Sequence, residues 1–147
     1  MKIYIGTDHR GVEIEKQIVS SLRDNNYEVE ESNLPHSDTD DYVDFAFDVA
    51  NKVKNDKDSF GILICGTGIG MSIAANKIKG IRAARCTSPM DAYHTRNDNH
   101  SNVLCLGYNQ HLNVLLELID TFLNTKGSLE ERHLRRVGKI TSYEEGV

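Results

Sequence analysis

The residues best suited to chemistry form one run in the middle of the chain, Cys65-Gly66-Thr67-Gly68-Ile69-Gly70. A strand-like apolar segment precedes this run and a helical pattern follows it. Glycines let the backbone approach a ligand closely, and they leave the amide N–H groups of a helix start pointing outward. We therefore predict that this loop forms a cradle for an anion or an oxyanion, with Gly66, Gly68, Ile69 and Gly70 as its backbone donors.

The cysteine beside the cradle is a candidate proton carrier. Amide groups that stabilise negative charge suit proton transfer next to a carbonyl, where an enediolate develops. They also favour the thiolate form of Cys65. A cysteine that closes an apolar strand is also often a small buried hydrophobe, and the residues alone leave both interpretations open. Cys86 and Cys105 have no glycine loop after them, which favours a core role for both.

The loop does not match the usual nucleotide-binding patterns. The third glycine of G-x-G-x-x-G would fall on Met71, the strand-like segment 81–86 ends without a carboxylate for a ribose, and no Walker lysine is present. A metal site is not expected either, because the spacing of the histidines is not typical of metal ligands; these are His36, His94, His111 and His133.

Two other sets of polar residues are candidates for substrate contacts. Asp8 and His9 follow the first strand-like run, where a carboxylate can bind sugar hydroxyls and an imidazole can face an anion. The alternative for this pair is turn and capping chemistry. Arg132 and Arg136 are four residues apart and share one helix face, so both can reach one phosphate. The alternative for the arginines is a solvated helix surface.

Alternating strand-like and helical patterns position these residues. Short apolar runs predict strands at 2–6, 27–32, 60–65, 81–86 and 102–106. Amphipathic runs predict helices at 12–23, 43–53, 68–78 and 112–123, and the Ser128–Glu131 capping signal predicts a last helix that carries the arginines. This order is typical of an α/β protein, a three-layer α/β/α sandwich around a Rossmann-like five-stranded parallel sheet.

The expected sheet also predicts where the polar loops meet. Ligands of such sheets bind beyond the carboxyl ends of the strands. We therefore expect three segments to converge on one edge of the sheet: Asp8–Gly11, Cys65–Gly70 and the polar stretch Arg96–His100 before the fifth strand.

Size and composition narrow the class of protein. With 147 residues, 39 % hydrophobic and 27 % charged, the chain can bury one core, so we expect a single domain, 1–147. The net charge of −5 gives no overall attraction to nucleic acid or to an anionic membrane. No apolar stretch approaches membrane-spanning length, and no signal peptide precedes the first strand. Three cysteines without a secretory signal indicate reduced thiols and a cytoplasmic protein.

Several motifs together resemble ribose-5-phosphate isomerase type B, nearly from end to end. They are Asp8-His9-x-Gly11, Asp41-Tyr42, the long run Gly61–Lys77, Gly80–Ala83, Asn102–Leu104 and Arg132-His133-x-x-Arg136. The related galactose-6-phosphate isomerase subunits share the fold and differ around the site. The resemblance implies interconversion of ribose 5-phosphate and ribulose 5-phosphate through a cis-enediolate, without a metal ion or an organic cofactor.

The resemblance also implies a role for each site residue. Cys65 would move the proton between C2 and C1, the backbone of Gly66–Gly70 would hold the enediolate oxygens, and Thr67 would orient the base. Contacts with the sugar and its phosphate would come from Asp8, Tyr42, Asn99, His9, Arg132 and Arg136. The site would be shared between two subunits, so a homodimer is implied, in some members paired into a tetramer, with the C-terminal helix extending to the partner.

Three positions depart from the family pattern. Members typically read Arg-x-His-Asn-Asp-x-Asn-Val before the fifth strand, with the histidine opening the furanose ring. Here Asp98 stands in its place, so Asp98, His100 or His94 is the candidate ring-opening base. Asn109 replaces a common arginine, and Arg85, a charged residue within a predicted strand, is a candidate substitute for it.

These departures keep two other functions open. One is an isomerase of another aldose phosphate, such as allose 6-phosphate, galactose 6-phosphate or a tetrose phosphate. The other is a non-catalytic module that binds a sugar phosphate, although the presence of Cys65 and Thr67 argues against it.

Overall fold

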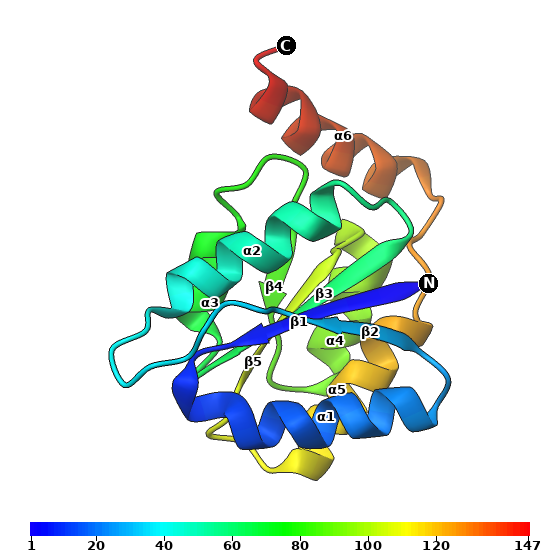
Figure 1. The fold of residues 1–147 in the computed structure, drawn as a ribbon. Helices are drawn as coiled ribbons and strands as arrows, with labels where there is room; N and C mark the ends of the chain where they lie inside the picture. The colour runs from blue at the N-terminus through cyan, green and yellow to red at the C-terminus, as the bar shows by residue number, and fades with distance from the viewer.

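A computed structural model describes residues 1–147 as five parallel strands and six α-helices (Figure 1). The strands are β1 (Lys2–Thr7), β2 (Glu28–Glu31), β3 (Ser59–Cys65), β4 (Ala83–Arg85) and β5 (Val103–Gly107). The helices are α1 (Val12–Asp24), α2 (Tyr42–Lys54), α3 (Ile69–Ala75), α4 (Pro89–Asn99), α5 (Leu112–Asn124) and α6 (Glu131–Glu145), with a short 3₁₀ turn η1 (His9–Gly11) before α1. The strand order is β2-β1-β3-β5-β4.

Two hydrophobic layers fix the sheet between its helices. Ile62 and Ile64 of β3 point to one face, where they pack with apolar residues of α1, α4 and α5. Leu63 and Cys65 point to the other face and pack with α2 and α3. Because side chains alternate along a strand and both faces are covered, β3 is buried along its length. The predicted three-layer α/β/α sandwich with a five-stranded parallel sheet is confirmed.

The sequence analysis did not predict α4 as an element, although its start signal is present. Ser88 caps the helix, accepting a hydrogen bond from the Asp91 amide at 3.2 Å, and Pro89 occupies the first turn. Only Ala92 and Thr95 of this helix are buried, so the sequence shows no apolar stripe of helical period.

The last helix exists, but it begins later than the capping signal indicated. Glu130 is its N-cap residue, without a side-chain capping bond. The Ser128 hydroxyl instead accepts a hydrogen bond from the Glu130 amide at 3.1 Å, and this bond closes a short turn before the helix. The prediction that Ser128 starts the helix is therefore wrong.

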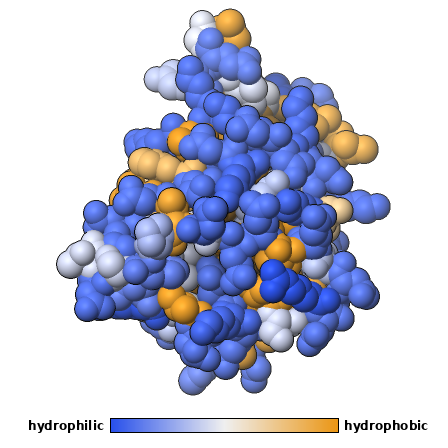
Figure 2. All heavy atoms as spheres, viewed as in Figure 1, coloured by the Kyte–Doolittle hydropathy of each residue, from blue (hydrophilic) through white to orange (hydrophobic).

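Helix α6 lies outside the sandwich, beyond the amino ends of the strands, and its C-terminal end projects from the molecule (Figure 1). His133 is its only buried residue. None of the helices is both long and apolar enough to cross a membrane. The face seen in Figure 2 is largely hydrophilic, with small separate apolar groups, which is ordinary for a protein surface.

Candidate active site

The predicted cradle forms at the tip of β3, where the chain turns into α3. Gly68 has φ +81°, and a Cβ there would lie 3.0 Å from the backbone of Leu106, so this turn requires glycine. The Gly68 N–H donates to the Cys65 sulfur at 3.2 Å. The Thr67 hydroxyl accepts a hydrogen bond from the Ile69 amide at 3.2 Å. The turn therefore points a backbone N–H donor at the sulfur.

The start of α2 covers the far side of the cradle. A Cβ on Gly70 would come within 2.6 Å of the Tyr42 ring, so the ring lies directly against this glycine. The Tyr42 side chain is partly exposed, which leaves it accessible to a ligand in the cradle. The structure thus brings Tyr42 and the Gly66–Gly70 loop together.

Asp8 lies at the tip of β1 and has a capping role. Its carboxylate accepts a hydrogen bond from the Arg10 amide at 3.1 Å, at the start of η1. Tyr108, which follows β5, lies beside it, and burial together with the Asp8 carboxylate raises the pKa of the Tyr108 phenol. The Tyr108 amide also donates to the Cys65 carbonyl at 3.0 Å. Tyr108 is a residue of this edge that the sequence analysis missed, although its place after a predicted strand was a signal.

His9 is held by a carboxylate that the sequence analysis also missed. Asp40 Oδ1 lies 2.7 Å from His9 Nδ1 and accepts from the His9 amide at 3.1 Å, while its Oδ2 lies 3.0 Å from His36 Nδ1. Burial of Asp40 acts to raise its pKa, but the hydrogen bonds from His9 and His36 prevail and hold it at about 2. An ionised Asp40 accepts a proton-bearing Nδ1, so His9 Nε2 stays free for a ligand. No sequence spacing links Asp40 to His9.

Arg85 forms a hydrogen bond with the cradle loop. It lies on the edge strand β4 with an exposed side chain, and its Nε donates to the Thr67 carbonyl at 2.8 Å. The charged residue within a strand is thus accommodated by an edge position and by the loop itself. Its guanidinium lies beside the cradle, at the carboxyl edge of the sheet.

The other two cysteines are core residues, as predicted. Cys86 and Cys105 are 1 % and 0 % exposed. Burial raises the pKa of Cys86 to about 12 and raises that of Cys105 as well. No group of three or more histidine, cysteine, aspartate or glutamate side chains is arranged to hold a metal ion.

The predicted convergence of all three polar segments on one edge is wrong within a single chain. Helix α4 runs back across the sheet, so Asp98 and Asn99 lie where β5 begins, and Cys65 lies where β3 ends. A residue that precedes a parallel strand belongs to the amino edge, opposite the ligand edge. Arg132 and Arg136 are also remote from the cradle, on α6 beyond the amino ends of the strands (Figure 1).

Asp98 is surrounded by proton donors. The Asn97 side-chain amide donates to it at 2.8 Å, and its oxygens lie 3.4 Å from His94 Nδ1 and 3.8 Å from His133 Nε2. The hydrogen bond from Asn97 lowers the pKa of Asp98 most, burial acts to raise it, and the two histidines add to the lowering. Asp98 is therefore ionised at neutral pH, as a base requires.

His100 has a structural role in this chain. It ends α4 with φ +50°, and its Nε2 lies 2.7 Å from the Ser128 carbonyl oxygen. Its ring packs against Gly127, where a Cβ would come within 2.5 Å. These contacts attach the segment before α6 to the end of α4.

Arg132 and Arg136 of α6 occupy an exposed surface of the single chain. Arg132 donates to the Glu130 carboxylate at 2.9 Å, while Arg136 forms no ion pair. Within one chain both guanidinium groups therefore lie on a solvated helix surface, and neither reaches the cradle of its own chain.

Fold and geometry together define a Rossmann-like α/β protein whose glycine-rich loop lies at the carboxyl edge of its sheet, the edge at which ligands of such folds bind. A family model described as ribose/galactose isomerase matches residues 3–140. The chain belongs to this family.

Individual relatives cover almost the whole chain. A Mycoplasma genitalium protein named as a probable ribose-5-phosphate isomerase B is 42 % identical over 149 residues, covering 97 % of this chain and 95 % of the relative. The structure of Clostridium thermocellum ribose-5-phosphate isomerase B is 42 % identical, with a TM-score of 0.92 and 99 % of each chain covered. The structure of Mycoplasma genitalium ribose-5-phosphate isomerase B with bound ribulose-5-phosphate is 39 % identical, with a TM-score of 0.93, covering 99 % of this chain and 97 % of that one.

Proposed function

We propose that this protein is an aldose–ketose isomerase that interconverts ribose 5-phosphate and ribulose 5-phosphate. The observation that carries the proposal is the Gly68 N–H aimed at the Cys65 sulfur, inside a glycine cradle at the carboxyl edge of the sheet. A relative of almost the same fold is named as holding ribulose-5-phosphate.

The chemistry requires one base and one oxyanion site. The Cys65 thiolate takes the proton from C2 of the open-chain aldose, and the electrons of that C–H bond form the C1–C2 double bond of a cis-enediolate. The amides of the Gly66–Gly70 loop that make no bond within the loop stabilise the negative oxygen, whereas the Gly68 and Ile69 amides are engaged by the Cys65 sulfur and the Thr67 hydroxyl. The proton of the C2 hydroxyl then passes to the C1 oxygen and the proton on sulfur returns to C1, which gives the ketose, and no cofactor takes part.

Substrate contacts on this edge come from α2 and the β1 loop. Asp8 and Tyr42 lie beside the cradle and bind sugar hydroxyls in this proposal. His9 contacts the phosphate through Nε2, because Asp40 holds its Nδ1. Asp40 is thus a positioning residue.

The remaining site residues come from a second copy of the chain. Asp98, Asn99, Arg132 and Arg136 cannot reach the cradle of their own chain, so a homodimer in which each subunit supplies these residues to the other completes the site. Exposed apolar side chains around the edge strand β4 support this assembly; they are Ile69, Ile73, Met90, Tyr93, Leu134 and Ile140. Homodimer interfaces are rich in such residues.

Ring opening precedes isomerisation and uses the residues that the second subunit supplies. Asp98, ionised, accepts the proton of the C1 hydroxyl as the bond between C1 and the ring oxygen breaks. The ring oxygen gains a proton, for which His94 and His133 are the nearest donors to Asp98.

We place the enzyme, as a single domain with reduced thiols, in the cytoplasm; all three cysteines are free.

A panel of phosphorylated sugars tests this function. Turnover of ribose 5-phosphate should exceed that of allose 6-phosphate, galactose 6-phosphate and tetrose phosphates by a large factor in kcat/KM. Rapid turnover of one of the other sugars with negligible pentose turnover would contradict the proposed substrate. Binding of sugar phosphates without any turnover would indicate a non-catalytic module.

A further inference from the structure

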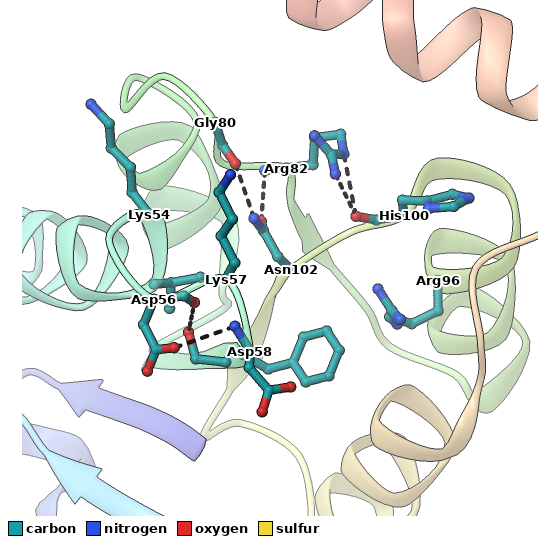
Figure 3. Close-up of a pocket in the computed structure, with 12 residues that line it drawn as sticks. Lys54, Asp56, Lys57, Asp58, Gly80, Arg82, Arg96, His100 and Asn102 are labelled. Carbon is teal, nitrogen blue, oxygen red and sulfur yellow. Dashed lines mark hydrogen bonds between the residues drawn. The ribbon is translucent and has the colours of Figure 1, made fainter. Parts of the chain in front are cut away.

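A second pocket lies at the amino edge of the sheet, at the opposite end from Cys65 (Figure 3). Its volume is about 410 Å³, within the usual range for small-molecule sites. The loop between α2 and β3, the segment before β4 and the end of α4 form its walls. None of the residues assigned to the isomerase site lines it.

Positive charge gathers in this pocket, although the chain as a whole carries −5. Lys54, Lys57, Arg82 and Arg96 line it, together with His100. No carboxylate forms an ion pair with any of the four permanent cations. In Figure 3 the side chain of Lys57 extends up toward Asn102, and the guanidinium groups of Arg82 and Arg96 lie above and to the right of the opening.

Two acidic residues, Asp56 and Asp58, also line the pocket, and their carboxylates are engaged by other groups. Asp56 accepts a hydrogen bond from the Tyr4 hydroxyl at 3.0 Å, and Asp58 lies 3.7 Å from the N-terminal amine. Both point away from Arg82 in Figure 3. Glu144 of α6, whose charge acts on Arg82, accepts a hydrogen bond from the Gly80 amide at 3.0 Å.

The two arginines are half-buried, and their hydrogen bonds all go to backbone carbonyls, while the Arg96 guanidinium also lies over the Phe60 ring, 4.5 Å from its centre. Arg82 donates to the carbonyls of Asn99 and His100, both at 2.9 Å. Arg96 donates to the Ser101 carbonyl at 2.6 Å and the Thr125 carbonyl at 3.2 Å. Burial lowers the pKa of both guanidinium groups, and their mutual repulsion adds to this for Arg96. Half-buried like charges destabilise each other, and a bound anion would add to the partial compensation that Glu144 gives Arg82.

We propose that this pocket is a second anion site, which binds the dianionic phosphate of a phosphorylated small molecule. Four cations from three segments and two aspartates give the lining a formal charge of +2, which balances a dianionic phosphate monoester. Guanidinium groups present N–H donors in the planar fork that phosphate oxygens favour. The volume leaves room for a sugar-sized group beside the phosphate. The site is separate from the one that binds substrate, and it does not depend on the proposed isomerase activity.

Inorganic phosphate is the probe that tests this site. Equilibrium dialysis with radiolabelled phosphate should find two sites per chain in the parent protein. The Lys54→Glu/Lys57→Glu variant should keep one site, with the affinity of the other weakened by about tenfold or more. Arg132→Ala/Arg136→Ala should keep the pocket site and lose the one at the proposed active site. Lys16→Glu/Lys126→Glu changes the net charge by the same amount on other exposed lysines and should keep both sites.

Both pocket lysines are exposed, so the charge-reversal variant should fold and retain its isomerase kcat. Lys57→Gln, a milder change, should weaken the same site several-fold and provides a second test. The proposal would be overturned if the parent bound only one phosphate per chain and the Arg132→Ala/Arg136→Ala variant bound none. Two unaltered sites in both pocket-lysine variants would overturn it as well. Two sites remaining in Arg132→Ala/Arg136→Ala would instead count against the proposed substrate-phosphate contacts alone.

Discussion

At the scale of single residues, Cys65 combines burial with a hydrogen bond from the Gly68 amide to its sulfur. The sequence was sufficient to predict the loop and to nominate the cysteine. It could not decide between a buried hydrophobe and a base, because that choice depends on where one N–H group points. The left-handed conformation of Gly68 sets this direction.

His9 and Asp40 provide a test at this scale. Asp40→Ala removes the acceptor that holds the His9 ring, so His9 should bind the substrate phosphate less well. A lost hydrogen bond to a charged group corresponds to roughly a tenfold or greater rise in KM, with kcat little changed. Steady-state kinetics on ribose 5-phosphate measure both constants. Asp38→Ala, in the same exposed loop, is the control and should leave KM unchanged. An unchanged KM in Asp40→Ala would remove His9 from phosphate binding.

The same carboxylate predicts a pH dependence of stability. The folded pKa of Asp40, about 2, is below the usual value of about 3.9 for the unfolded chain, so its interactions stabilise the fold fully above that value. This contribution is lost as the pH falls from about 4 through about 2. Urea unfolding at a series of pH values should show the parent losing more stability over this range than Asp40→Asn does. Parallel losses in both proteins would contradict the assigned pKa.

At the scale of elements, apolar patterns located all five strands and four of the six helices to within a few residues, and a capping signal indicated a fifth helix, α6. It failed for α4, which buries only Ala92 and Thr95. Asp98 and Asn99 are at the end of this helix, so missing it also placed them at the wrong edge of the sheet. The strand order could not be read from the chain either, because it depends on contacts between distant segments.

Glu15 of α1 offers a test at this scale. It is 7 % exposed, and burial, with a contribution from Glu31, raises its pKa to about 7. A raised carboxyl pKa means that ionisation opposes folding, so stability falls as the pH rises from about 4 to about 7 and stays lower above that. Glu15→Gln should therefore raise the free energy of unfolding by about 1–3 kcal/mol at pH 8 and by little at pH 4.

Denaturant unfolding of Glu15→Gln at both pH values measures this difference. Glu13→Gln removes an equal charge from an exposed position of the same helix and should show no comparable gain. An equal effect of Glu15→Gln at pH 4 and pH 8 would show that ionisation is not the cause.

At the scale of the whole molecule, the two groups of site residues lie at opposite ends of one chain. The sequence alone led us to expect one edge, and only the resemblance to a family indicated a shared site. The structure makes this sharing a physical requirement of the proposed mechanism, since α6 cannot bring Arg132 and Arg136 to Cys65 of the same subunit.

Mixing two inactive variants tests the shared site. Cys65→Ala and Arg132→Ala/Arg136→Ala should each be almost inactive alone. In a mixed dimer, one of the two sites combines the intact cradle of one chain with the intact arginines of the other. After random exchange of subunits in an equal mixture, about a quarter of the parent activity should return. No recovery, with exchange verified by native mass spectrometry, would contradict a site built from two subunits.

The most direct test of the central claim follows the proton itself. In deuterium oxide, the parent enzyme should exchange the C2 proton of ribose 5-phosphate during turnover. Cys65→Ala should lose both exchange and turnover by a factor of about 10³ or more, while it still binds inorganic phosphate at the proposed active site. Cys86→Ala, which alters a core cysteine, is the matched control and should retain kcat within about twofold. Exchange and turnover in Cys65→Ala at the parent rate would contradict the assignment of Cys65 as the base.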